Sequence, residues 1–148
     1  MELQASDLEG KDDLLTLNDF SEESVLLNVK TRFKDQGKIF TQIGAPILIS
    51  VNPYRRLPIF NIGFAQKVRD YSSQIRGLKT STRGVTVQNP GPHLFMMAED
   101  SFQQLIIDQK NQSIIITGES GAGKTEACKI ILAYIARASE DVFLGDPE

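Results

Sequence analysis

The stretch Gly118-Glu119-Ser120-Gly121-Ala122-Gly123-Lys124-Thr125 decides how this sequence of 148 residues is interpreted. It matches the pattern G-x-x-x-x-G-K-[ST] at every fixed position, and this pattern indicates a phosphate-binding loop. The glycines allow successive backbone N–H groups to point into one concavity, which suits an anion. Lys124 would reach the β- and γ-phosphates of a nucleotide, and the Thr125 hydroxyl would ligate Mg²⁺.

The residues on either side of the loop predict a strand and a helix. Ser113-Ile114-Ile115-Ile116-Thr117 is a short β-branched run typical of a buried strand, and residues 124–138 have helical periodicity. The helix start adds free N–H groups and the positive end of its dipole. A chance match in a glycine-containing turn is the alternative, and this strand–loop–helix context argues against it. The loop alone does not name a function, because kinases, GTPases, helicases and motors share it.

Apolar periodicity and turn residues predict the helices, strands and loops in the rest of the chain. Residues 1–17 read as a weakly structured lead-in, and residues 18–148 as one structural unit. Helices are predicted at 22–35, 64–71 and 93–109, the first with Ser21 as its N-cap. Strands are predicted at 39–43 and 47–51, the second apolar enough to be buried on both faces. The stretch 72–92 is rich in Ser, Thr, Gly and Pro, and predicts a loop.

Composition excludes several classes of function. The net charge is −3 and the sixteen basic residues are scattered, so neither a nucleic acid nor an anionic membrane surface is expected as a partner. No run approaches the length of a membrane span, and the default is a cytoplasmic protein. The single cysteine, Cys128, is predicted to lie in the core. The single histidine, His93, is expected to cap or pack at a helix start rather than bind metal.

Several segments together resemble the motor head of the myosin family. The loop with the following Glu126 and the preceding Asn111–Thr117 resemble the myosin phosphate-binding loop and its lead-in strand. Matches in the same order along the chain are Ser24–Phe33, Ile49–Tyr54, Leu57–Phe60, Pro92–Phe95 and Ala98–Asp100. The resemblance implies an α/β fold of the P-loop NTPase type, of which this chain would form an N-terminal, incomplete part. It also implies an actin-based motor that binds Mg-ATP and is associated with the cytoskeleton.

The same resemblance implies a nucleotide site made of two segments. The phosphates would lie on Gly118, Glu119, Ser120, Gly121, Ala122, Gly123, Lys124, Thr125 and Glu126, with Thr125 as the magnesium ligand. Asn52 and Pro53 would border the adenine, with Arg56 and Phe60 nearby. Phe60 stands where many myosins have Tyr, and Ala127 where Asn is common, so two polar contacts near the nucleotide would be missing.

Two departures from the family leave the activity of this chain open. The stretch 72–92 diverges, and no residue is carried over inside it. Only 23 residues follow Thr125, and they contain neither of the family's two switch segments. We therefore expect no ATP hydrolysis by this chain alone, and actin binding only through parts that come later in the family. The alternatives are a nucleotide- or partner-binding module without catalysis, and an unrelated P-loop kinase or GTPase.

Overall fold

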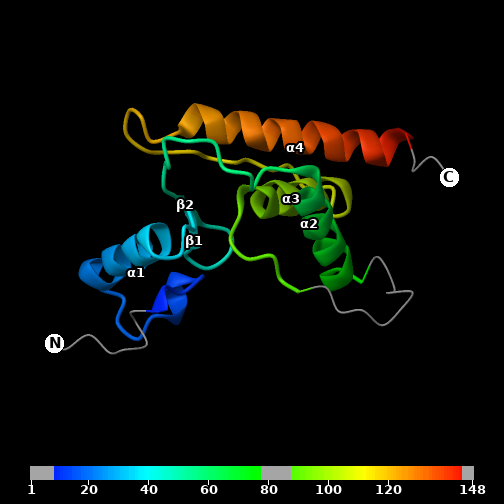
Figure 1. Cartoon of the computed structure of the whole chain (residues 1–148). Helices are drawn as coiled ribbons and strands as arrows, with labels where there is room; N and C mark the ends of the chain where they lie inside the picture. Colours follow the sequence, from blue (N-terminus) through cyan, green and yellow to red (C-terminus); the bar gives the residue numbers. More distant parts are fainter. Residues whose placement is uncertain (1–8, 78–87, 145–148) are drawn as a thin grey trace. The chain divides into compact units, whose positions relative to one another are not determined.

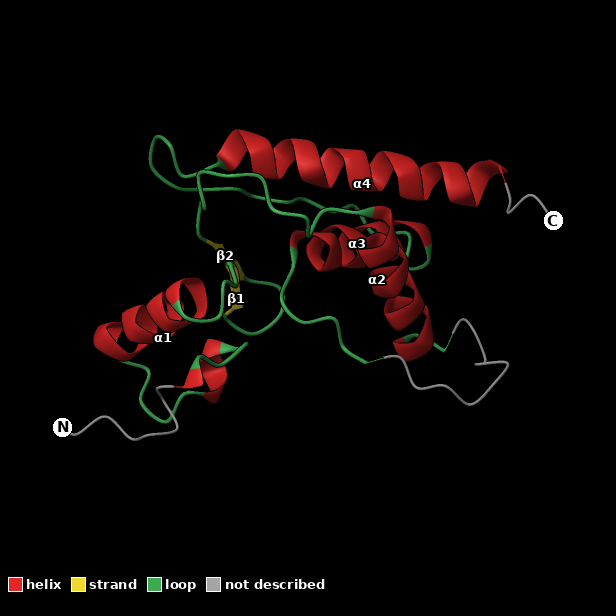
Figure 2. Ribbon diagram, viewed as in Figure 1, coloured by secondary structure: helices red, strands yellow, loops and turns green. Residues whose placement is uncertain are grey.

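The computed structural model describes residues 9–77 and 88–144, and these divide into two compact units. The first unit contains the described residues up to Tyr54 together with Gly91–His93. The second contains the described residues from Arg55 to Pro90 and from Leu94 onward. Figure 1 traces the elements along the chain, and Figure 2 shows that helices predominate.

The first unit combines helix α1 (Glu22–Lys34) with a small antiparallel sheet. The Ser21 side chain accepts a hydrogen bond from the Ser24 N–H and caps α1, as predicted, and Glu22 and Glu23 occupy its first turn. Strands β1 (Phe40–Gln42) and β2 (Leu48–Ser50) pair with Thr41 opposite Ile49. β2 is not buried on both faces as expected. Leu48 and Ile49 are half-buried, and Ile47 just before them is 56% exposed. A sheet of only two strands is too small to have both of its faces buried.

Residues 1–8 of the expected lead-in at 1–17 lie outside the described residues, whereas residues 9–17 contain a capped turn and a bridge to β1. A 3₁₀ turn at Leu14–Thr16 is capped by Asp13, whose carboxylate accepts from the Leu15 N–H. Leu14 is fully buried, and Asp13 forms a parallel bridge with Gln42 of β1. Pairing with a distant strand therefore orders a segment that lacks strong local signals.

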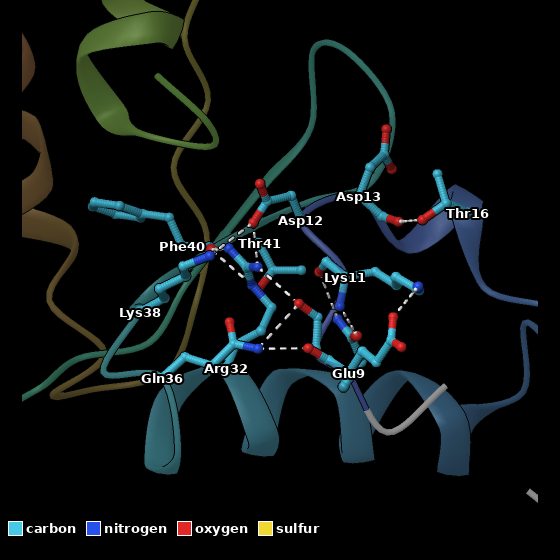
Figure 3. A network of polar contacts seen from close by, with 12 residues as sticks. Glu9, Lys11, Asp12, Asp13, Thr16, Arg32, Gln36, Lys38, Phe40 and Thr41 are labelled. Carbon is cyan, nitrogen blue, oxygen red and sulfur yellow. Dashed lines mark hydrogen bonds and ion pairs between the residues drawn. The ribbon is translucent and has the colours of Figure 1, made fainter. Parts of the chain in front are cut away.

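A buried arginine joins the elements of the first unit (Figure 3). Arg32 of α1 is 1% exposed. Its Nη2 donates to the Phe40 carbonyl oxygen at 2.7 Å, its Nε to Thr41 Oγ1 at 2.9 Å and its Nη1 to the Gly10 carbonyl oxygen at 3.2 Å. Nη1 also forms an ion pair with Asp12. Because these bonds run to the turn region and to β1, a single guanidinium fixes α1 against both.

The second unit consists of three helices, α2 (Ile62–Ile75), α3 (Leu94–Ile106) and α4 (Lys124–Leu144), with α3 packed against both others. The Asn61 side chain caps α2 by accepting from the Phe64 N–H at 2.9 Å. α2 is longer than the predicted 64–71, so residues 72–75 of the expected loop are helical. Residues 88–92 have neither helix nor strand, and the remaining part of that loop prediction, 78–87, lies outside the described residues.

The predicted strand at 113–117 is not a strand in this structure. The segment pairs with no strand among the described residues, and it runs alongside α4 before the chain turns into the loop (Figure 1). Its side chains still alternate: Ile114 and Ile116 are half-buried, whereas Ile115 is 88% exposed. The periodicity of a half-buried strand is therefore present, but the hydrogen-bonding partners that define a sheet are not among the described residues.

Candidate functional site

The loop Gly118–Thr125 has the backbone shape that its glycines allow. Gly118, Gly121 and Gly123 have φ values of 147°, 80° and 94°, in the region that favours glycine. A Cβ on Gly118 would approach the Ala122 Cβ to 3.0 Å, so the turn also leaves little room there. The Ala122 N–H donates to the Glu119 carbonyl oxygen at 3.2 Å and closes the turn. Gly118 to Gly121, including Glu119 and Ser120, are exposed, which leaves the loop accessible to a ligand.

Lys124 opens helix α4, as predicted, and its side chain folds back over the loop. Its Nζ donates to the carbonyl oxygens of Gly118 and Glu119 at 2.7 and 2.8 Å. The ammonium is therefore held by two carbonyl oxygens of the loop on which the anion is expected. The Ala127 N–H donates to the Gly123 carbonyl oxygen at 2.9 Å and starts the helical ladder. The N–H groups at the start of α4 then have no earlier helical turn to bond to, as in anion-binding helix ends.

Thr125 is the candidate magnesium ligand, and its position fits that role. The residue is exposed in the first turn of α4, directly after Lys124. Mg²⁺ in nucleotide sites takes one or two protein oxygens and completes its shell with phosphate oxygens and water. A single exposed hydroxyl beside the loop matches that requirement. Among the residues that the structure describes, no group of three or more His, Cys, Asp or Glu side chains could hold a metal ion.

Glu126 follows Thr125 and forms an ion pair that the sequence reasoning missed. Its Oε1 lies 2.8 Å from Lys129 Nζ, one helical turn further on. The hydrogen bond and the charge of Lys129 lower the pKa of Glu126, and the charge of Arg56 lowers it further. Glutamate and lysine three residues apart on a helix are a recognisable pairing signal.

The predicted base-binding segment divides between the two units. Arg56 and Phe60 belong to the second unit, with the loop, whereas Asn52 and Pro53 belong to the first. Asn52 Oδ1 accepts a hydrogen bond from the Tyr54 N–H at 2.9 Å, which forms a tight turn. Arg56 and Phe60 therefore share the second unit with the loop Gly118–Thr125.

Glu99 and Tyr134 form a buried polar contact between α3 and α4. The Tyr134 hydroxyl donates to Glu99 Oε2 at 2.8 Å, and Gln103 Nε2 donates to Oε1 at 2.8 Å. Burial raises the pKa of Tyr134, and the neighbouring Glu99 charge and hydrogen bond raise it further. The sequence reasoning missed this pair because its members are 35 residues apart, although a glutamate among Phe95, Ala98 and Phe102 was a possible signal.

Cys128 is exposed, so the prediction of a core position is wrong. It lines an apolar groove of about 280 Å³ with Ile114, Ile116 and Ile131. His93, in contrast, is buried directly before α3 and its ring lies edge-on to Phe40 at 5.0 Å, which agrees with the expected packing role. Among the described residues, no helix is long and apolar enough to cross a membrane.

Comparison with known proteins assigns the chain to a family. The family model "Myosin head (motor domain)" matches residues 11–142. The chain belongs to the myosin head family. Unconventional myosin-Ib of Mus musculus is 40% identical over 139 residues, which is 92% of this chain and 11% of that protein. The myosin-I heavy chain of Dictyostelium discoideum is 43% identical over 125 residues, 84% of this chain and 5% of that protein.

The chain is also similar to myosins other than the myosin-I proteins. Unconventional myosin-Vb of Mus musculus is 39% identical over 129 residues, 87% of this chain and 6% of that protein. The chain thus spans between 5% and 11% of the length of these relatives. The matched region of this myosin head chain contains Gly118–Thr125 and residues 52–60.

Proposed function

We propose that this chain is the ATP-binding portion of a myosin-type, actin-based motor, and that it cradles the phosphates of Mg-ATP on Gly118–Thr125. One observation carries the proposal: a glycine-shaped loop of a myosin head sequence leads directly into the N-terminus of α4, with the Lys124 ammonium held by its carbonyl oxygens. The fold of the complete motor would be of the P-loop NTPase type, with this chain supplying an N-terminal part. Its place in the cell would be the cytoplasmic actin cytoskeleton.

The residues of the loop have separable roles in this proposal. The backbone N–H groups of 119–123 and of the first turn of α4 would bind phosphate oxygens. The Lys124 ammonium would leave the Gly118 and Glu119 carbonyls and neutralise charge on the β- and γ-phosphates. The Thr125 hydroxyl would hold Mg²⁺, which bridges phosphate oxygens and offsets their charge. Glu126 would complete the phosphate segment, whereas Asn52 and Pro53 would border the base with Arg56 and Phe60 nearby.

Hydrolysis requires more than this cradle. An attacking water must be held in line with the γ-phosphate while charge on the γ-oxygens is stabilised. Lys124 and the loop N–H groups would supply part of the charge stabilisation, and Ser120 is a lone exposed hydroxyl. We therefore assign turnover, force generation and actin binding to the complete motor. The second candidate function is a nucleotide-binding module without catalysis.

Equilibrium binding of Mg-ATP to the 148-residue chain tests the proposal. The wild-type chain should bind Mg-ATP and inorganic triphosphate, whereas Lys124→Ala should weaken both by about tenfold or more, because a charge-assisted contact to phosphate is lost. Arg137→Ala is the control, since it removes an exposed basic side chain from the same helix, far from the loop. Equal binding by wild type and Lys124→Ala would exclude the loop as the phosphate site.

A further inference from the structure

The segment 55–60 is connected to helix α4 through aromatic rings within the second unit. The Phe60 ring lies edge-on to Phe95 of α3 at 6.0 Å, and Phe95 in turn contacts Tyr134 of α4 at 4.8 Å. Phe60, which follows a turn at residues 58–59, is therefore linked to α4 by way of α3.

Phe95 is the residue through which Phe60 is connected to α4. Its ring is 7% exposed and contacts three other rings: Phe60, Tyr134 and Phe64, the last at 6.4 Å. Tyr134 is itself fixed, because its hydroxyl donates to the buried Glu99 at 2.8 Å. In a close-packed cluster of rings, a ring that moves must displace its neighbours. The place of Phe60 therefore depends on Phe95, and the place of Phe95 on an anchored α4 residue.

We propose that Phe95 is a positioning residue for nucleobase recognition: it sets the location of Phe60 relative to α4, and thereby the separation between the base site and the phosphate loop. This inference rests on the proposed function, in which Phe60 lies near the base. Phe60 has no hydroxyl group, so it would bind an aromatic base through the shape and the quadrupole of its ring. Both interactions depend on where the ring is held. Phe95 acts through Phe60 and touches neither phosphate nor base.

The test separates base recognition from phosphate binding by comparing two ligands. The dissociation constants of Mg-ATP and of inorganic triphosphate are measured by titration calorimetry on the wild-type chain and on Phe95→Leu. Loss of an aromatic contact should weaken ATP binding about three- to tenfold and leave triphosphate binding unchanged. A variant that merely loosens the fold would weaken the binding of both ligands together. A change in the ratio of the two dissociation constants therefore indicates a change in the position of Phe60.

Phe102→Leu is the matched control. Phe102 lies on the same helix, is 4% exposed, and undergoes the same substitution of phenylalanine by leucine. It lines the groove beside Ile114 rather than the aromatic cluster. The ratio of the dissociation constants of Mg-ATP and triphosphate should be the same in Phe102→Leu as in wild type. If Phe95→Leu does not fold, Phe95→Met takes its place, because methionine fills more of the space while still removing the ring. The double variant Phe60→Leu/Phe95→Leu should lose no more selectivity than the worse single variant.

Each outcome decides the matter. An unchanged ratio in the Phe95 variants, or the same change of ratio in Phe102→Leu, overturns the inference and leaves the proposed function standing. A wild-type chain that binds triphosphate as tightly as ATP overturns the inference and the base site, but not the phosphate site. A wild-type chain that binds neither ligand overturns the proposed function and this inference with it.

Discussion

The Tyr134 hydroxyl donates a 2.8 Å hydrogen bond to Glu99, and it joins the helix that begins at the phosphate loop to the helix that precedes it. Tyr134→Phe removes this donor and leaves a carboxylate that is 1% exposed with Gln103 as its remaining donor. We expect a loss of about 1–3 kcal/mol in the free energy of unfolding. Urea denaturation followed by circular dichroism measures it. Tyr71→Phe on α2 is the control, and equal losses in both variants would contradict a specific role for the pair.

Arg32 should be the most sensitive residue of the first unit. Arg32→Met keeps much of the side-chain volume but leaves the Phe40 and Gly10 carbonyls and Asp12 without the guanidinium. Leaving buried carbonyl oxygens without their donor costs about 1–3 kcal/mol, and the half-exposed Asp12 adds little to this because water can solvate it. Loss of amide hydrogen-exchange protection in α1 and β1 checks the expectation. Lys34→Met, an exposed change on the same helix, should leave protection intact, and retained protection in Arg32→Met would refute the prediction.

The Arg32–Asp12 pair predicts the direction of an acid-induced loss of stability. Burial raises the pKa of Asp12, but the hydrogen bond and charge of Arg32, with a contribution from Lys38, outweigh it and lower the pKa below its ordinary value. The folded-state pKa then lies below the unfolded value of about 4. The stabilisation is therefore present above that value and is lost as the pH falls through the folded-state pKa.

Asp12→Asn checks this pH dependence. The variant should be less stable than wild type near neutral pH, and the difference should shrink as the pH falls toward 3 or so. Denaturation midpoints between about pH 3 and pH 7 measure both effects, with the exposed Asp35→Asn as the control. A stability difference that stays constant across this range would show that the Asp12 charge does not contribute.

The isolated chain should expose apolar surface and aggregate. Ile115 is 88% exposed within a β-branched run that pairs with no described strand, and Leu132 on α4 is 61% exposed. Ile115→Thr keeps the β-branch and should lower both dye binding and light scattering. Ile114→Thr, one position earlier, changes a half-buried side chain of the groove and should reduce stability instead. A wild-type chain that is monomeric and binds no apolar dye would count against the prediction.

The chain alone should bind Mg-nucleotide without turning it over. Positioning the attacking water and stabilising its transition state each contribute several kcal/mol, so a site without both should be slower by many powers of ten. Phosphate release by purified chain in Mg-ATP measures turnover, and Lys124→Ala reports contaminating ATPase. Multiple turnovers that disappear in the Lys124→Ala variant would show that the prediction is wrong.

Local signals in the sequence predicted the elements that depend on neighbouring residues. Ser21 caps α1, and Lys124 opens α4 after a glycine-rich loop, because capping and backbone shape are decided within a few residues. The predicted strand at 113–117 was wrong, because a strand requires a hydrogen-bonding partner that local residues do not reveal. The buried roles of Arg32 and Glu99 were also missed, because each depends on groups many residues away.

The folded-back side chain of Lys124 gives the phosphate loop a built-in competitor. Its ammonium already donates to the carbonyl oxygens of Gly118 and Glu119, so a phosphate gains this charge only by taking it from two acceptors. In the proposed function, the affinity for phosphate would therefore be the difference between these two sets of bonds.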